Sequence, residues 1–237
     1  MNNPHKPTRR DLLVSGTAAA VIGATPVLGR RGESKEVLKV GLVGCGGRGT
    51  GAAAQALRAD PNTKLVALAD AFPDALENSL RTLSGTADIA DRVDVTPENQ
   101  FVGFDAYKGV IDNCDVVLLA TSPHFRPLHV EAAVNAGKHL FVEKPVATDG
   151  PGLRRIWAAC DKAKEQGTVL VSGLCYRYQF AKQETVKRIH DGAIGEITAM
   201  QTSYNTGGLW HKGRKPEWSD MEYQMRNWLY FGWLSGD

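Results

Sequence analysis

A short glycine pattern is the first feature of the chain that indicates a chemistry. It has the form G-x-G-x-x-G. A mostly apolar run (residues 38–43), typical of a buried parallel strand, precedes it, and a run of small side chains (residues 50–57), typical of a helix, follows it. Between a strand and a helix, such glycines allow a tight turn and a close approach of pyrophosphate to backbone N–H groups. We therefore expect a dinucleotide to contact Gly44, Gly46, Gly47, Arg48 and Gly49.

A carboxylate at the end of the next apolar run indicates which dinucleotide is bound. Residues 64–69 predict a second strand, which leads into Asp70 about 20 residues after Gly49. A carboxylate at that place accepts hydrogen bonds from the hydroxyls of the adenosine ribose and repels a 2′-phosphate. Asp70 therefore favours NAD over NADP. The alternative is a structural role for Asp70 as a turn or helix-capping acid.

The elements that position these residues alternate between strand and helix. Residues 115–120 and 139–142 predict further buried strands, and residues 125–136 predict a helix that ends at Gly137. This alternation predicts an α/β fold, a Rossmann-type doubly wound parallel sheet with ligands at the carboxyl ends of its strands. The residues expected at such ends are Gly44, Asp70, Thr121 and Lys144.

Three segments carry a resemblance to a known family. Residues 40–46 read VGLVGCG, residues 120–124 read ATSPH, and residues 136–145 read AGKHLFVEKP. With these motifs the chain resembles the Gfo/Idh/MocA family of NAD(P)-dependent oxidoreductases, from about Leu38 to the last residue. The resemblance implies a Rossmann domain followed by a substrate domain, and hydride exchange with a nicotinamide cofactor.

The resemblance also implies roles for single residues. Lys144 matches the lysine of the EKP motif, which assists proton transfer at the substrate carbon that exchanges hydride. Glu143 and Pro145 match neighbours that shape the nicotinamide-ribose pocket, and Arg177 matches an arginine near cofactor or substrate. The cofactor contacts expected beyond the glycine turn are Asp70, Thr121, Pro123, His124, Glu143, Lys144 and Arg177.

Some of these polar residues also have a purely structural interpretation. Lys144 would then be a surface lysine in a loop. His124, His129 and Arg126, near the start of a predicted helix, would then serve as caps or packing residues.

The first 36 residues predict an export signal. Arg9 and Arg10 precede an apolar run of small residues from about position 12 to 28, and a charged passage follows. This is the layout of a twin-arginine signal. The run is shorter than the roughly 20 residues of a membrane-spanning helix. We therefore expect transport to the periplasm by the twin-arginine machinery, with a membrane anchor if the signal stays uncleaved. A disordered basic N-terminus is the alternative.

The second half predicts the beginning of another domain. Residues 151–166 predict a helix capped by Asp149 and ended by Gly167. A strand over 168–172, a helix over 180–190 and a strand over 197–204 follow, and the resemblance implies an α+β substrate domain with a largely antiparallel sheet. The expected parts are residues 1–36 for the signal, 37–165 for the Rossmann domain and 166–237 for an incomplete substrate domain.

Aromatic side chains gather near the end of the chain. Trp210, Trp218, Trp228 and Trp233 lie among basic residues. Sugar stacking or core packing is favoured over a nucleic-acid surface, because the basic run is short. Family members continue well past such a point, and the histidine that pairs with the EKP lysine lies in that further part. We therefore expect a fragment of a longer protein; a shortened protein with an exposed sheet edge is the alternative.

Composition excludes several other classes. The 237 residues are 43% hydrophobic and 23% charged, as in soluble globular domains, and 28 basic against 26 acidic residues create no field for a polyanion. Four cysteines lie far apart with no C-x-x-C pair, which speaks against a zinc site or a disulfide framework. We expect buried or half-buried thiols at Cys45, Cys114, Cys160 and Cys175.

Together these features predict an exported oxidoreductase. It would transfer hydride between a sugar-like polyol or ketosugar and a tightly held NAD, with NADP less favoured, because a periplasm has no freely exchanging pool of the cofactor. We expect a homo-oligomer with a small-molecule substrate and no nucleic-acid partner. The alternatives are an NAD-dependent glycosidase that oxidises its sugar transiently, and a non-catalytic protein that binds a dinucleotide or sugar.

Overall fold

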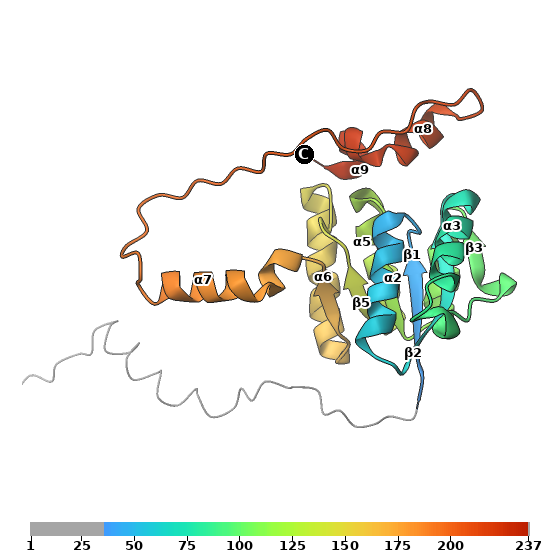
Figure 1. Cartoon of the computed structure of the whole chain (residues 1–237), viewed down its shortest axis with the longest axis horizontal. Coiled ribbons are helices and arrows are strands. Elements are labelled where there is room, and N and C mark those ends of the chain that lie inside the picture. Colours follow the sequence, from blue (N-terminus) through green and yellow to red (C-terminus); the bar gives the residue numbers. More distant parts are fainter. Residues whose placement is uncertain (1–35, 237) are drawn as a thin grey trace, which may run out of the picture. The chain divides into compact units, whose positions relative to one another are not determined.

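Six parallel strands form one sheet, in the order β3-β2-β1-β4-β5-β6 (Figure 1). The computed structural model describes residues 36–236, so the predicted export signal lies outside the described residues. The strand order is that of a doubly wound Rossmann fold and confirms the predicted fold class. The strands are β1 (Leu38–Val43), β2 (Thr63–Asp70), β3 (Gln100–Val102), β4 (Val116–Leu119), β5 (His139–Val142) and β6 (Leu170–Ser172).

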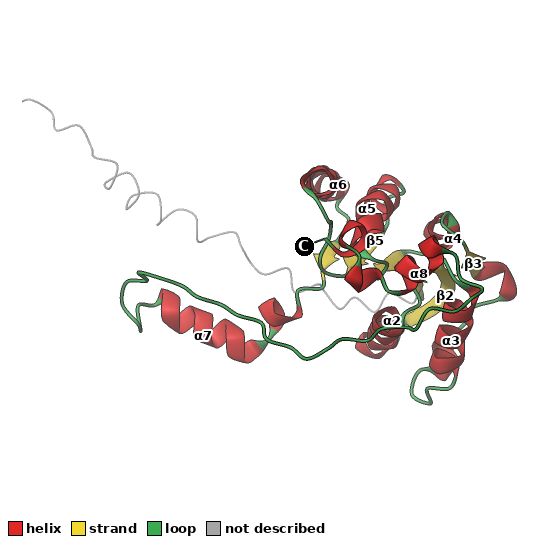
Figure 2. Ribbon diagram, turned by 90° about the horizontal axis from the view of Figure 1, so that it is seen from above, coloured by secondary structure: helices red, strands yellow, loops and turns green. Residues whose placement is uncertain are grey.

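Helices cover both faces of the sheet. Figure 2 shows α2 and α3 on one face and α4, α5 and α6 on the other. Among residues 36–236, no helix is long and apolar enough to cross a membrane. The α-helices are α2 (Gly47–Ala59), α3 (Pro73–Ser84), α4 (Ala106–Asn113), α5 (Arg126–Asn135), α6 (Gly150–Gln166), α7 (Phe180–His190), α8 (Asp220–Arg226) and α9 (Gly232–Ser235).

The apolar runs of the strands fill two hydrophobic clusters, one on each face of the sheet. Successive side chains of a strand point to opposite faces, so Leu118 belongs to one cluster, whereas its neighbours Val117 and Leu119 belong to the other. Likewise Leu42 packs in one cluster and Val43 in the other. A parallel sheet covered on both sides needs such continuous apolar strands, which explains why the sequence pattern was readable.

The predicted ends of two helices are confirmed. Gly137 and Gly167 follow α5 and α6 with φ of +69° and +70°, a backbone conformation that favours glycine. At the other end of α6, a side-chain oxygen of Asp149 accepts a hydrogen bond from the backbone N–H of Gly152 at 2.6 Å. This is the predicted cap, and it fixes the chain direction after β5.

The expected antiparallel sheet is absent from the described residues. Residues 197–215 form neither helix nor strand, so the prediction of a strand over 197–204 is wrong for this structure. A single strand gains stability only beside a partner strand, and none of the described strands runs beside these residues. Strand β6 belongs to the parallel sheet, which therefore extends past residue 165.

Candidate functional site

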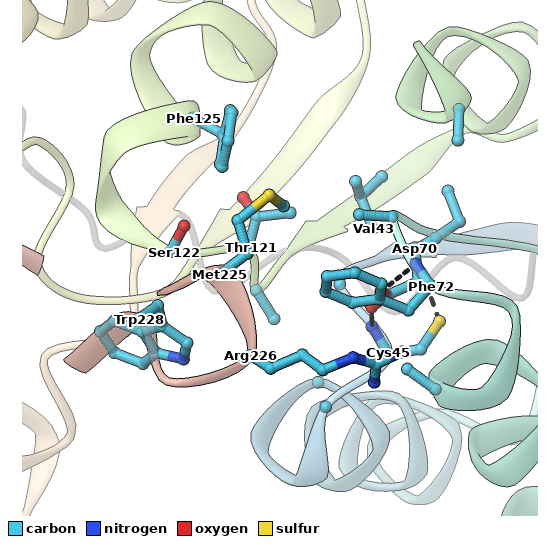
Figure 3. Close-up of a pocket in the computed structure, with 18 of the residues that line it drawn as sticks. Val43, Cys45, Asp70, Phe72, Thr121, Ser122, Phe125, Met225, Arg226 and Trp228 are labelled. Carbon is cyan, nitrogen blue, oxygen red and sulfur yellow. Dashed lines mark hydrogen bonds between the residues drawn. The ribbon is translucent and has the colours of Figure 1, made fainter. Parts of the chain in front are cut away.

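A cavity of about 650 Å³ opens at the carboxyl ends of β1, β2 and β4. Strands β1 and β4 lie next to each other in the sheet although β2 and β3 come between them in the sequence. This is the topological switch point, where open α/β sheets bind their ligands. Residues 210–236 are called the C-terminal segment. Figure 3 shows Asp70 and Thr121, from the ends of two strands, facing this cavity together with Arg226 and Trp228 from the C-terminal segment.

The glycine turn between β1 and α2 has the geometry of a pyrophosphate site. Gly44 has φ of +98°, and a Cβ on Gly49 would lie 1.9 Å from the carbonyl oxygen of Gly44, so both positions exclude a side chain. At Gly46 and Gly47 a Cβ would meet nothing within 4 Å. These two glycines therefore leave open space at the N-terminus of α2, where backbone N–H groups attract an anion. The turn fits the dinucleotide that the sequence predicts.

Asp70 lies beside this turn, at the end of β2. One carboxylate oxygen accepts from the backbone N–H of Cys45 at 2.7 Å, and the other accepts from Phe72 at 2.9 Å. The structural role for Asp70 is thus real, but a carboxylate has about four acceptor positions, so acceptor capacity remains for ribose hydroxyls. Burial raises the pKa of Asp70 above its usual value, against the lowering effect of backbone N–H donors, among them those of Phe72 and Cys45.

A buried carboxylate connects the glycine turn with the EKP segment. Glu143, after β5, is 4% exposed, and its Oε1 accepts from Nε of Arg48 at 2.5 Å. Its other oxygen accepts from the backbone N–H of Lys144 at 3.2 Å. The Lys144 side chain is exposed. Glu143 and Lys144 therefore lie next to the residues of the cavity without lining it.

Arg126, at the start of α5, is buried beside the same segment. Its Nη1 donates to the carbonyl oxygen of Pro145, while its Nε has no hydrogen-bond partner. Burial lowers the pKa of Arg126 to about 10, and the nearby Glu143 opposes that effect. Arg126 thus holds the backbone after Lys144, which favours the packing interpretation for this residue.

His129 lines the cavity as a buried, uncharged ring. Its imidazole stacks on Tyr107 at a centroid distance of 4.3 Å, and its Nδ1 lies 3.4 Å from Oγ1 of Thr121. Burial lowers the pKa of His129 to about 4, so the ring is neutral at physiological pH. His124 instead packs edge-on against Phe125 and Trp233, outside the cavity lining.

The structure brings together most of the predicted cofactor contacts, but not all. Pro123 is buried in the 3₁₀ helix η3 (Pro123–Phe125), away from the cavity. Arg177 lies in the 3₁₀ helix η4 (Cys175–Tyr178) after the edge strand β6, with an exposed side chain that does not line this cavity, so its expected contact with cofactor or substrate stays a prediction. The predicted residues that do line the cavity are Gly44, Gly46, Gly47, Arg48, Gly49, Asp70 and Thr121.

The cavity also contains residues that sequence reasoning missed. Phe72 after β2 and Asp74 in the first turn of α3 line the cavity, and the C-terminal segment contributes Lys212 and Arg226. Nothing in their local pattern identified them, because they meet only through the fold. The clustered aromatic residues were noticed, and two of them, Trp210 and Trp228, line the cavity.

The cysteines agree with the expectation at three of four positions. All four are free thiols, with Cys45 and Cys114 buried and Cys160 half-buried, but Cys175 is exposed. Burial raises the pKa of Cys114 to about 12 and raises that of Cys45 further. Within residues 36–236, no cluster of histidine, cysteine and carboxylate side chains could hold a metal ion.

Comparison with known proteins places this geometry in a family. The model of the Gfo/Idh/MocA oxidoreductase family, described as having an NAD-binding Rossmann fold, matches residues 38–172, more than half of the chain. A dTDP-3,4-didehydro-2,6-dideoxy-alpha-D-glucose 3-reductase from Actinomadura kijaniata is 24% identical over 70% of this chain and 45% of its own length. A glycosyl hydrolase family 109 protein from Streptomyces coelicolor is 27% identical over 88% of this chain and 43% of its own.

Solved structures agree with the family match. A 3-ketoreductase from Actinomadura kijaniata, in complex with NADP and TDP-benzene, aligns with a TM-score of 0.50 and 25% identity, over 68% of this chain and 44% of the other. A myo-inositol 2-dehydrogenase from Lactobacillus plantarum shares the fold with a TM-score of 0.55 at 24% identity, over 68% and 43%. The chain spans less than half the length of these relatives. It belongs to the Gfo/Idh/MocA family of oxidoreductases with an NAD-binding Rossmann fold.

Proposed function

We propose that this protein transfers hydride between a sugar-like polyol or ketosugar and a tightly held NAD. One observation carries the proposal: the glycine turn, Asp70 and Thr121 meet at one cavity, at the switch point of the sheet. The relatives support the substrate class, since their names include a deoxysugar 3-reductase and an inositol dehydrogenase.

Different residues of the chain would bind the cofactor and move the proton. The N-terminus of α2, open at Gly46 and Gly47, would hold the pyrophosphate, and Asp70 would accept the ribose hydroxyls. When bound, the nicotinamide accepts or donates the hydride. Lys144 would move the proton of the substrate hydroxyl or carbonyl oxygen, from the exposed position that its side chain has after β5.

A glycosidase is the second candidate, favoured by the glycosyl hydrolase family 109 relatives. In that reaction a sugar hydroxyl would be oxidised transiently, the aglycone eliminated, and the product reduced by the same cofactor. The same cavity and the same lysine would serve it. A non-catalytic protein that binds a dinucleotide or sugar is the remaining alternative.

The proposal also covers the cellular location and the oligomeric state of the protein. The twin-arginine pattern at Arg9 and Arg10 supports export of the folded protein to the periplasm, with its cofactor already bound. A cofactor lost there would not be replaced, so we expect retention through each catalytic cycle. We also expect a homo-oligomer.

Net turnover of cofactor separates the candidates. The purified protein is incubated with NAD and a panel of polyols, and separately with aryl glycosides, while reduced nicotinamide and free aglycone are measured. A dehydrogenase accumulates reduced cofactor with a polyol. A glycosidase releases aglycone without net reduction. Binding of NAD without either product identifies a non-catalytic protein, and no binding of NAD or NADP contradicts the proposal.

A further inference from the structure

Several residues of the C-terminal segment line the cavity, and one of them, Arg226, pairs with a carboxylate of α3. Arg226, at the end of α8, forms a bidentate ion pair with Asp74 in the first turn of α3. The two Nη–Oδ distances are 3.0 and 2.9 Å. Nε of Arg226 donates to Glu222, one turn earlier in α8, at 2.9 Å. The arginine side chain is only 10% exposed, so both carboxylates act on a largely desolvated group.

Aromatic rings fix the same guanidinium. Its Cζ lies 4.0 Å from the centroid of the Phe72 ring and 4.8 Å from that of Trp218. Figure 3 shows the Arg226 side chain alongside Phe72. Because the backbone N–H of Phe72 also donates to Asp70, the arginine contacts the residue that helps to orient the ribose carboxylate. Arg226 therefore stands at the end of the cavity where the adenosine ribose would lie.

The charges at the adenosine end of the cavity determine whether a ribose with a 2′-phosphate can bind there. A free arginine here would attract the 2′-phosphate of NADP. Three of the five N–H groups of Arg226 are instead used by Asp74 and Glu222. The hydrogen bonds and the charge of Arg226 lower the pKa of Asp74 below its usual value. Among Asp70, Asp74, Glu222 and Arg226, three negative charges stand against one positive charge.

We propose that the pairing of Asp74 and Glu222 with Arg226 determines cofactor specificity: the two carboxylates keep Arg226 from binding a 2′-phosphate, and their negative charge repels one. This inference rests on the proposed function, because it takes the ligand to be a dinucleotide. It differs from the role of Asp70, since it assigns part of the selection to a segment outside the family-matched residues 38–172.

Removing one of the two carboxylates tests the assignment. The full chain, freed of any retained cofactor, is titrated with NAD and with NADP by calorimetry, and the readout is the ratio of the two dissociation constants. We expect the unmodified chain to bind NAD at least about tenfold more tightly than NADP. In Asp74→Asn the ratio should fall by about fivefold or more, because a negative charge is lost and Arg226 gains freedom toward a phosphate. Glu222→Gln should shift it in the same direction.

Further variants separate selection from mere packing. Arg226→Gln leaves both carboxylates unpaired, so the ratio should stay the same or rise. Asp88→Asn is the matched control, because Asp88 forms a comparable bidentate pair with Arg58, and neither residue lines the cavity. Lys212→Ala, on the same segment, checks that this other lining cation is not the source of any NADP binding.

The outcomes distinguish this inference from the proposed function. If the chain binds NAD and both carboxylate variants keep the ratio within twofold, or weaken both dinucleotides equally, Arg226 has only a structural role and the inference fails. A drop in the ratio that persists in Asp74→Asn/Arg226→Gln would also overturn it, since the gain would not come from the arginine. If the unmodified chain binds neither dinucleotide, the proposed function itself fails.

Discussion

Nε of Arg48 donates to the buried carboxylate of Glu143 across 2.5 Å and thereby joins the first turn of α2 to the end of β5. The two residues are 95 positions apart in the chain. The same carboxylate accepts from the backbone N–H of Lys144. The pyrophosphate turn and the segment of the proposed catalytic lysine are therefore connected through one side chain.

Replacement of Arg48 should lower the free energy of unfolding. Arg48→Ala leaves Glu143 buried without its cationic partner, and the free energy of unfolding should fall by about 1–3 kcal/mol. The partly exposed Arg48 side chain keeps the effect below that of a fully buried pair. Urea unfolding measures the change. The double variant Arg48→Ala/Glu143→Gln should recover part of the loss, and a loss equal to the sum of the single variants would contradict the coupling.

Two glycines of the same helix should respond in opposite directions. A Cβ at Gly49 would collide with the carbonyl oxygen of Gly44, so Gly49→Ala should destabilise the fold by about 1–3 kcal/mol. At Gly51 a Cβ meets nothing within 4 Å, and Gly51→Ala should stabilise the helix by about 0.5–1 kcal/mol. Thermal unfolding measures both variants. Equal shifts of their unfolding temperatures would contradict the close contact between Gly49 and the carbonyl oxygen of Gly44.

His129 should make stability depend on pH. Its pKa is about 4 in the fold and about 6.5 in the unfolded chain, so the unfolded state binds the extra proton between these values. Stability is complete above pH 6.5 and falls as the pH drops toward 4, by about 2 kcal/mol between pH 7 and pH 5. Urea unfolding at both pH values measures this. His129→Gln should remove that part of the pH dependence, and an unchanged slope would contradict the buried neutral ring.

Lys144 should matter for turnover and not for binding. Its side chain does not line the cavity, so Lys144→Ala should leave the dissociation constant of NAD within about twofold. With a substrate found by the polyol and glycoside panel, kcat should fall by ~10² or more. Lys164 on α6 is also an exposed lysine. Its replacement, Lys164→Ala, is the control and should keep full turnover. An unchanged kcat in Lys144→Ala would remove this residue from the proposed mechanism.

The parts of the molecule that the sequence predicted are those that local chemistry determines. Strand β1, the glycine turn and α2 follow one another within about two dozen residues, and each restricts the backbone on its own. The glycine ends of α5 and α6 were readable for the same reason. Helices α3 and α4 and the short β3 were not predicted from the sequence, although Leu76, Leu80 and Leu83 give α3 a helical spacing.

What could not be predicted depends on contacts between distant residues. Arg226 and Asp74 lie 152 positions apart, and no local spacing indicates their ion pair. The prediction of a strand over 197–204 is wrong for a related reason. The local pattern favours a strand, but a strand is stable only beside a neighbouring strand, which the described residues do not supply.

Calorimetric titration with NAD of the unmodified chain and of Gly46→Val, each first freed of retained cofactor, tests the central claim most directly. The valine side chain would start in open space, so the fold should tolerate it, but it would occupy the place of the pyrophosphate. We predict one NAD bound per unmodified chain and at least about a tenfold weaker affinity in Gly46→Val, with the same thermal unfolding temperature. No binding to the unmodified chain, or equal affinity in the variant, would contradict a dinucleotide site at this turn.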